Sequence, residues 1–228
     1  MCAFEKLDNE IAGRKLLFDE YKNHVIPQSI KFDPLTHENS YRTLPDNLEN
    51  VFASHQISRY DFIHNFGYCL ICGDWIQPLS KWLGKRNCLE VGCGSGILAC
   101  ALRTYGVNVI ATDDFSWHNT KWEENLWVDD MYGIDAVDAV NLYGRGVDIV
   151  IMSWPPMGVP MASNVLAAAR HYDLPILYIG EGAYGCTGDI QFNQSLAQRF
   201  KPDQPGIVTV NEMYPNWYSI YDSVSVIH

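Results

Sequence analysis

The chain of 228 residues is 47% hydrophobic and 19% charged, which is enough apolar content for one globular domain with a sizeable core. Its formal net charge of −11 disfavours a broad surface for nucleic-acid phosphates, but does not exclude a local basic groove or a single flipped base. The N-terminus lacks the pattern of a signal peptide, and no apolar run approaches the ~18 residues of a membrane span, so we expect a cytoplasmic protein without membrane contact.

The cysteines argue against both a disulfide framework and a metal site. Seven cysteines, an odd number, fit reduced thiols better than paired ones. Cys69 and Cys72 have the spacing of half a zinc site, but no second Cys or His pair stands at a matching distance. We therefore expect no bound metal.

The first sixty residues are interpreted as a helical extension. Apolar residues recur every three to four positions between Phe4 and Val25, which predicts an amphipathic helix. A loop is expected over 26–45 and a short helix after Asp46. We divide the chain into an N-terminal extension, 1–59, and a core domain, 60–228. The aromatic-rich start of the core domain could cover a ligand as a lid, with His64 as a base or as a structural hydrogen-bonding group.

Strand and helix patterns then alternate along the core domain. Strands are predicted at 87–91, 108–112, 148–153 and 175–180, with a weak strand around 130–134. Helices are predicted at 74–83, 96–105, 135–143, 158–171 and 190–199. Such alternation is typical of a parallel sheet with helices on both faces. Two further stretches, 206–213 and 217–227, flank Tyr-Pro-Asn and predict a C-terminal antiparallel hairpin.

A glycine-rich turn joins the first strand of this sheet to the next helix. It contains Gly92, Gly94 and Gly96, which allow a tight turn and a close approach of a ligand to the backbone. Dinucleotide enzymes place a third glycine where this chain has Ile97. The acidic Glu90 suits a cationic or amine-bearing ligand better than a pyrophosphate. The turn therefore predicts a ligand at a strand-to-helix crossing.

Acidic residues follow the next strands. Asp113 and Asp114 stand roughly twenty residues past the glycines, as a ribose-binding acid requires, and Asp113 is the first residue past the strand. Phe115 and Trp117 offer apolar surfaces for an adenine ring. The same segment could also be a solvated loop with two surface aspartates. Asp135 is predicted either beside the adenine or as a plain helix N-cap.

The strand at 148–153 ends in Ser153, Trp154, Pro155 and Pro156. Ligands of open α/β sheets bind beyond the carboxyl ends of the strands, so this segment is a candidate acceptor site. It could equally be a rigid turn that ends a buried strand.

The loop after strand 175–180 is the last candidate region. Glu181 could serve as a general base or bind a substrate amine, and Tyr184 could line the pocket. A surface loop with Asp189 capping the following helix explains the same residues.

Two of these segments resemble motifs of one family. The glycine turn with Glu90 resembles motif I of the class I S-adenosylmethionine-dependent methyltransferases, and the segment after Asp148 resembles motif IV of amino-group methyltransferases. The resemblance covers roughly residues 60–228. It implies a doubly wound α/β fold, with a mostly parallel seven-stranded sheet closed by a C-terminal antiparallel hairpin. It also implies that Glu90 orients the cofactor amino group.

The second motif departs from the family pattern, in which a polar residue is followed by Pro-Pro and an aromatic. Here Trp154 stands between Ser153 and the prolines, and Met157 replaces the aromatic. Either Trp154 supplies the stacking face from a shifted position, or the substrate is not a nucleobase.

The sequence thus favours methyl transfer from S-adenosylmethionine to an N or O nucleophile of a small molecule or nucleobase. Two alternatives stay open. One is a cofactor-binding module without catalysis, for which the altered Pro-Pro motif argues. The other is an NAD-linked oxidoreductase, for which only the generic glycine turn and acid argue.

Overall fold

The computed structural model describes residues 19–30, 59–117, 120–199, 205–217 and 220–228. Within this part of the chain, one sheet has the strand order β3-β2-β1-β4-β5-β6. All neighbouring strands pair in parallel except β5 and β6, which are antiparallel. The strands are β1 (Asn87–Val91), β2 (Asn108–Asp113), β3 (Tyr132–Gly133), β4 (Ile149–Ser153), β5 (Ile176–Glu181) and β6 (Asp222–Ile227).

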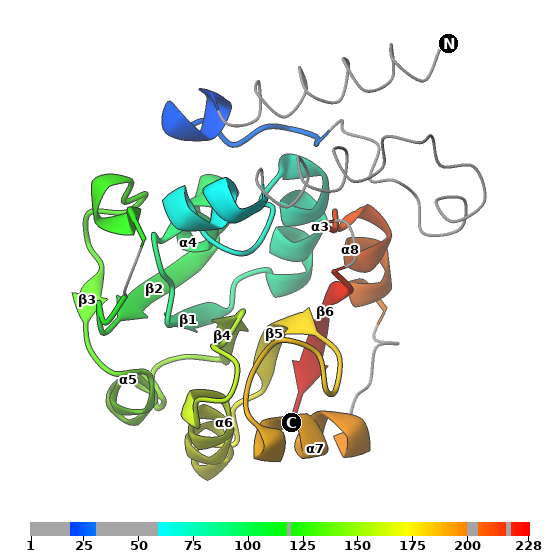
Figure 1. Cartoon of the computed structure of the whole chain (residues 1–228). Helices are drawn as coiled ribbons and strands as arrows, with labels where there is room; N and C mark the ends of the chain where they lie inside the picture. The colour runs from blue at the N-terminus through cyan, green and yellow to red at the C-terminus, as the bar shows by residue number, and fades with distance from the viewer. Residues whose placement is uncertain (1–18, 31–58, 118–119, 200–204, 218–219) are drawn as a thin grey trace, which may run out of the picture.

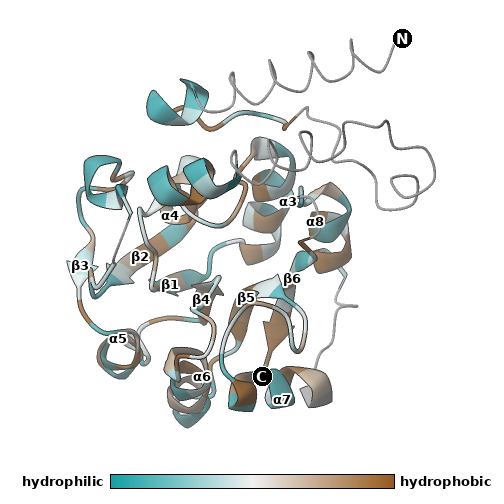
Figure 2. Cartoon of the chain, in the orientation of Figure 1, coloured by the Kyte–Doolittle hydropathy of each residue, from teal (hydrophilic) through white to brown (hydrophobic). Residues whose placement is uncertain are grey.

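Helices cover both faces of this sheet, as Figure 1 shows. One face carries α3 (Gly73–Leu83), α4 (Ile97–Thr104) and α8 (Ile207–Met213). The other carries α5 (Ala136–Tyr143), α6 (Met161–His171) and α7 (Ile190–Arg199). The central strands are buried on both faces and are coloured largely as hydrophobic in Figure 2, as a parallel sheet between two helical layers requires.

The predicted α/β alternation is confirmed from α3 to α7. The strand predicted at 87–91 has those bounds, and the weak strand expected around 130–134 is the two-residue β3. Each predicted helix of this region agrees with the observed one to within three residues at either end.

The C-terminal hairpin was predicted wrongly. Residues 207–213 form the helix α8, so only one of the two predicted strands exists, and it pairs with β5. The β-branched run suggested a strand, but Ile207 and Val210 are both fully buried at helical spacing, in the core that α8 shares with α3. The described residues therefore contain six strands where seven were expected.

Most of the N-terminal extension lies outside the described residues, but its described part packs on the core. Residues 19–22 and 59–65 are helical. Tyr21 is 1% exposed and lies against Phe62 and Phe66. Its hydroxyl donates to the Ile71 carbonyl and accepts from the Ile71 amide, at 3.0 Å. Residues on both sides of position 60 therefore share one core. None of the described helices has the length and apolar character of a membrane span.

Replacing Tyr21 by Phe tests this attachment. Tyr21→Phe leaves the buried amide and carbonyl of Ile71 without their partner, so we expect the free energy of unfolding to fall by about 1–3 kcal/mol. Urea unfolding measures the change, and Tyr60→Phe, at an exposed position, is the matched control. Equal stability of Tyr21→Phe and the wild type would contradict the attachment.

Candidate functional site

A cavity of about 1120 Å³ opens beyond the carboxyl ends of β1, β2 and β4. Because these strands are parallel neighbours, the segments that follow them meet at one edge of the sheet. This volume is slightly above the roughly 300–1,000 Å³ typical of a small-molecule pocket. The predicted site residues that line it are Glu90, Gly92, Gly94, Asp113, Asp114, Asp135, Ser153, Trp154, Pro155 and Pro156.

The glycine turn has the left-handed backbone that its sequence predicts. Gly92 and Gly94 have φ values of 61° and 59°. A Cβ on Gly94 would stand 3.0 Å from the Trp122 ring, and one on Gly92 would stand 2.6 Å from the end of the Met161 side chain. The left-handed backbone therefore favours glycine at both positions, and the neighbouring side chains leave little room for a larger residue.

Glu90 is a buried carboxyl group that lacks a full set of partners. It is 1% exposed, lines the cavity at the end of β1, and its Oε2 has no hydrogen-bond partner. Burial, followed by the nearby carboxyl group of Asp113, raises the pKa of Glu90 to about 8. An unpaired buried carboxyl oxygen is costly, so the position is suited to a ligand that brings a hydrogen-bond donor or a positive charge.

Asp113 joins the end of β2 to the glycine turn. Its Oδ2 accepts a hydrogen bond from the Gly94 amide at 2.8 Å, and its Oδ1 accepts one from the Phe115 amide at 2.9 Å. Burial raises the pKa of Asp113, and these amide hydrogen bonds oppose the rise. A carboxylate has about four acceptor positions, so Asp113 can still accept from a ligand. Asp114 accepts from the Ser116 amide at 2.9 Å and also lines the cavity.

Asp135 is the helix N-cap that its sequence position allowed. It caps α5, since its Oδ1 accepts from the Val137 amide at 2.8 Å, and it also lines the cavity. Asp138, in the first turn of the same helix, lines the cavity as well.

Trp154 is held in the cavity wall by a buried carboxylate. Its Nε1 donates to Asp222 Oδ2 at 2.9 Å, across to the first residue of β6. The same oxygen accepts from the Tyr214 hydroxyl at 2.6 Å, and Oδ1 accepts from Asn216 at 2.6 Å. Burial raises the pKa of Asp222, against the effect of these hydrogen bonds. Trp154 has a φ of 51°, a left-handed conformation that the surrounding contacts must stabilise.

The predicted residues that lie outside the lining of the cavity are Gly96, Phe115, Glu181, Tyr184 and His64, and Tyr184 is 72% exposed. Gly96 is the N-cap of α4 and packs against Val128. Phe115 is 40% exposed and contacts Trp117. Glu181 accepts hydrogen bonds from the Cys186 amide at 2.7 Å and from the Tyr221 amide at 3.1 Å. Its carboxylate therefore stabilises the loop that follows β5. Burial works against ionisation of Glu181, but these contacts lower its pKa overall.

The sequence interpretation gave no role to Trp122 or Asp138, and it included Tyr68 only within the aromatic-rich start of the core domain. All three side chains line the cavity. The only sequence signal for any of these residues was the aromatic content of 60–68, which includes Tyr68.

Most charged groups at the cavity are acidic, although the Arg59 guanidinium lies over the Trp154 ring of its wall, 5.8 Å from the ring centroid. The cavity lining in the described part of the chain includes no Lys, Arg or His. It does include five carboxyl groups, those of Glu90, Asp113, Asp114, Asp135 and Asp138. The described residues also contain no group of three or more His, Cys, Asp or Glu side chains placed to bind a metal ion. The site therefore favours ligands that carry donors or positive charge.

No protein-family model matches the chain, and no curated protein matches it. Among solved structures, a ribosomal protein L11 methylase from Lactobacillus delbrueckii subsp. bulgaricus is similar at 18% identity and a TM-score of 0.42, over 68% of this chain and 76% of that one. TehB from Haemophilus influenzae is similar at 13% identity and a TM-score of 0.44, over 75% and 66% of the two chains.

A magnesium protoporphyrin IX methyltransferase from Synechocystis PCC 6803, solved with bound S-adenosylmethionine, is similar over 95% of this chain and 97% of its own. Its identity is 13% and its TM-score 0.39.

The hydrogen bond between Trp154 and Asp222 generates a test. Asp222→Asn is expected to lower the free energy of unfolding by about 1.5–3 kcal/mol, because the amide offers one acceptor oxygen to three donors. In a double-mutant cycle with Trp154→Phe we expect a coupling of about 1 kcal/mol or more. Asp129→Asn, at an exposed position, is the control. Strict additivity of the two changes would show that the indole and the carboxylate do not interact.

Proposed function

We propose that the chain is an S-adenosylmethionine-dependent methyltransferase that acts on a nitrogen or oxygen nucleophile. One observation carries the proposal: the unpartnered, buried Oε2 of Glu90 at the cavity, directly before the glycine turn. An ammonium group is the natural partner for such a carboxylate, and the cofactor carries one on its methionine part.

The residues present fit this cofactor. Glu90 would pair with the amino group, and the bare backbone at Gly92 and Gly94 would allow the methionine part to approach. Asp113 and Asp114 would accept hydrogen bonds from the ribose hydroxyls. The start of α5, at 135–138, would lie beside the adenine ring.

In methyl transfer, the main task of the protein would be to position the acceptor against the methyl group. When bound, the sulfonium supplies an activated methyl group, whose bond to the acceptor forms as its bond to sulfur breaks, with the electron pair left on sulfur and the acceptor proton passing to water. Ser153 and the following prolines, on the strand next to β1, would place the acceptor for this attack. The reaction therefore needs no catalytic triad.

A nicotinamide dinucleotide fits the same cavity less well. Its pyrophosphate would lie among five carboxyl groups without a basic side chain in the described lining.

Calorimetric titration with S-adenosylhomocysteine, the product form of the cofactor, tests the proposal. We expect Glu90→Gln to bind it about ten- to a hundredfold more weakly, because a charge-assisted hydrogen bond contributes about 1.5–3 kcal/mol. Glu123→Gln, at an exposed position outside the cavity lining, should bind like the wild type. Equal binding by Glu90→Gln and the wild type, or tighter binding of NAD, would contradict the proposal.

A screen with methyl-labelled cofactor separates the enzyme from a binding module. Labelled product from any acceptor supports the enzyme. Cofactor binding without transfer to any acceptor would favour the non-catalytic module, for which the altered Ser-Trp-Pro-Pro segment argues.

A further inference from the structure

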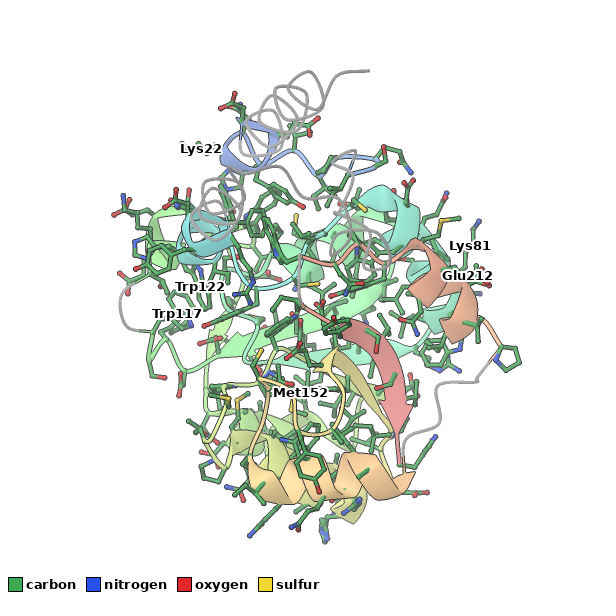
Figure 3. All side chains as sticks on the ribbon, turned by 45° about the vertical axis from the view of Figure 1, so that its right-hand side comes forward. Lys22, Lys81, Trp117, Trp122, Met152 and Glu212 are labelled. Atoms are coloured by element: carbon green, nitrogen blue, oxygen red, sulfur yellow. The ribbon has the colours of Figure 1, made fainter. Side chains whose placement is uncertain are left out.

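The segment between β4 and α6 exposes an uninterrupted apolar stretch, residues 156–160, which we call the apolar rim. It follows the end of β4, whose Met152 is labelled in Figure 3. Its sequence is Pro-Met-Gly-Val-Pro, and every one of its residues is exposed, with Met157 at 67% and Val159 at 47%. A run of exposed apolar residues adds nothing to the core and lowers solubility, so it indicates a surface that another molecule covers.

The apolar rim is continuous with the cavity. Pro156, Val159 and Pro160 are exposed and also line the cavity, so a ligand in the cavity would reach the rim directly. Met161, the next residue, continues this wall to the glycine turn, where a Cβ on Gly92 would stand 2.6 Å from the end of its side chain. The rim therefore extends the wall that faces the proposed cofactor-binding turn.

Charge divides the lining into two parts. The five carboxyl groups belong to β1 and to the segments around the end of β2 and the start of α5, whereas residues 153–168 contribute no charged side chain to the described lining. The Arg59 guanidinium, which lies over the Trp154 ring, is outside the lining. Because the proposed cofactor would occupy the acidic part, the acceptor meets a wall without charge.

The backbone of the apolar rim is held in place. The Gly158 amide donates to the Gly188 carbonyl at 3.0 Å, and the Gly188 amide donates to the Pro155 carbonyl at 3.0 Å. The rings of Pro156 and Pro160 fix one backbone angle at each end of the rim. A surface that is already ordered loses little conformational entropy when a ligand covers it.

We propose that the methyl acceptor is a small molecule with an uncharged aliphatic chain, which lies on the apolar rim while its nucleophile faces the cavity. This inference rests on the proposed function, since it names the acceptor class of the same reaction. Burial of apolar surface is favourable in proportion to its area, and the rim offers such surface without a polar side chain.

The shape of the rim favours a chain over other apolar partners. The rim itself carries no aromatic side chain, and the neighbouring Trp154 is only 7% exposed, so a planar ring finds no ring face to stack on there. A chain can follow the rim into the cavity, whereas a flat membrane or protein surface would cover only its outer side.

Straight-chain alcohols of increasing length test the inference. Butanol, hexanol and octanol are titrated calorimetrically into the full chain saturated with S-adenosylhomocysteine. We expect the affinity to rise about two- to fourfold for each added methylene group, so that octanol binds about four- to sixteenfold more tightly than hexanol.

Methionine side chains report where the chain lies. With isotopically labelled methionine methyl groups, the NMR signals of Met157 and Met161, identified by replacing each with Leu, should shift on addition of octanol. The signal of Met213, which is 54% exposed on α8 and outside the cavity lining, should not shift.

A pair of matched variants places the binding on the rim. Val159→Thr keeps the shape of the side chain and adds a hydroxyl group, so it should weaken octanol binding about three- to tenfold and leave the affinity for S-adenosylhomocysteine unchanged. Val208→Thr, at a position on α8 that is 44% exposed and outside the lining, should change neither.

Several outcomes would overturn the inference. They are an affinity that does not rise with chain length, an unchanged Val159→Thr variant, or a shift of the Met213 signal alone. Self-association of the chain that Val159→Thr abolishes would assign the rim to a second copy, and binding to phosphatidylcholine vesicles that it abolishes would assign the rim to a membrane. Failure of S-adenosylhomocysteine to bind would contradict the proposed function alone, because the alcohols can be titrated without it.

Discussion

The unpaired carboxyl group of Glu90 is the constraint on which the account of this site depends. Burying it at the end of β1 with one oxygen unbonded costs free energy that the fold does not recover by itself. The adjacent Asp113 increases the cost, and together they raise the pKa of Glu90 to about 8. A ligand with an ammonium group would relieve both effects. The buried, unpaired oxygen of Glu90 is thus the source of the proposed selectivity for the cofactor.

Hydrogen bonds across the sheet fix the walls around this carboxyl group. Asp113 holds the glycine turn through the Gly94 amide, and Asp222 holds Trp154 from the far edge strand, β6. The antiparallel strand therefore contributes to the cavity although its own residues lie three strands away from β1. A rigid wall of fixed aromatic rings is suited to a reaction that depends on the position of the acceptor.

Much of this arrangement could be predicted from the sequence, because local patterns determine it. The glycines, Glu90 and Asp113 lie at strand ends, and a parallel sheet brings such ends together. Residues 207–213 were predicted wrongly because a short β-branched run fits a strand and a helix equally, and packing against α3 decides the outcome. The contacts of Tyr68 with Trp122 and Trp154 could not be predicted, since these rings come from three segments that only the tertiary structure brings together.

The proton balance of cofactor binding tests the central claim most directly. Calorimetric titration of S-adenosylhomocysteine at pH 7, in buffers of different ionisation enthalpy, counts the protons released. Because burial and Asp113 raise the pKa of Glu90 to about 8 and an ammonium group would favour its charged form, the account predicts net proton release on binding by the wild type and clearly less by Glu90→Gln. A binding enthalpy independent of the buffer, or equal release by the two proteins, would contradict it.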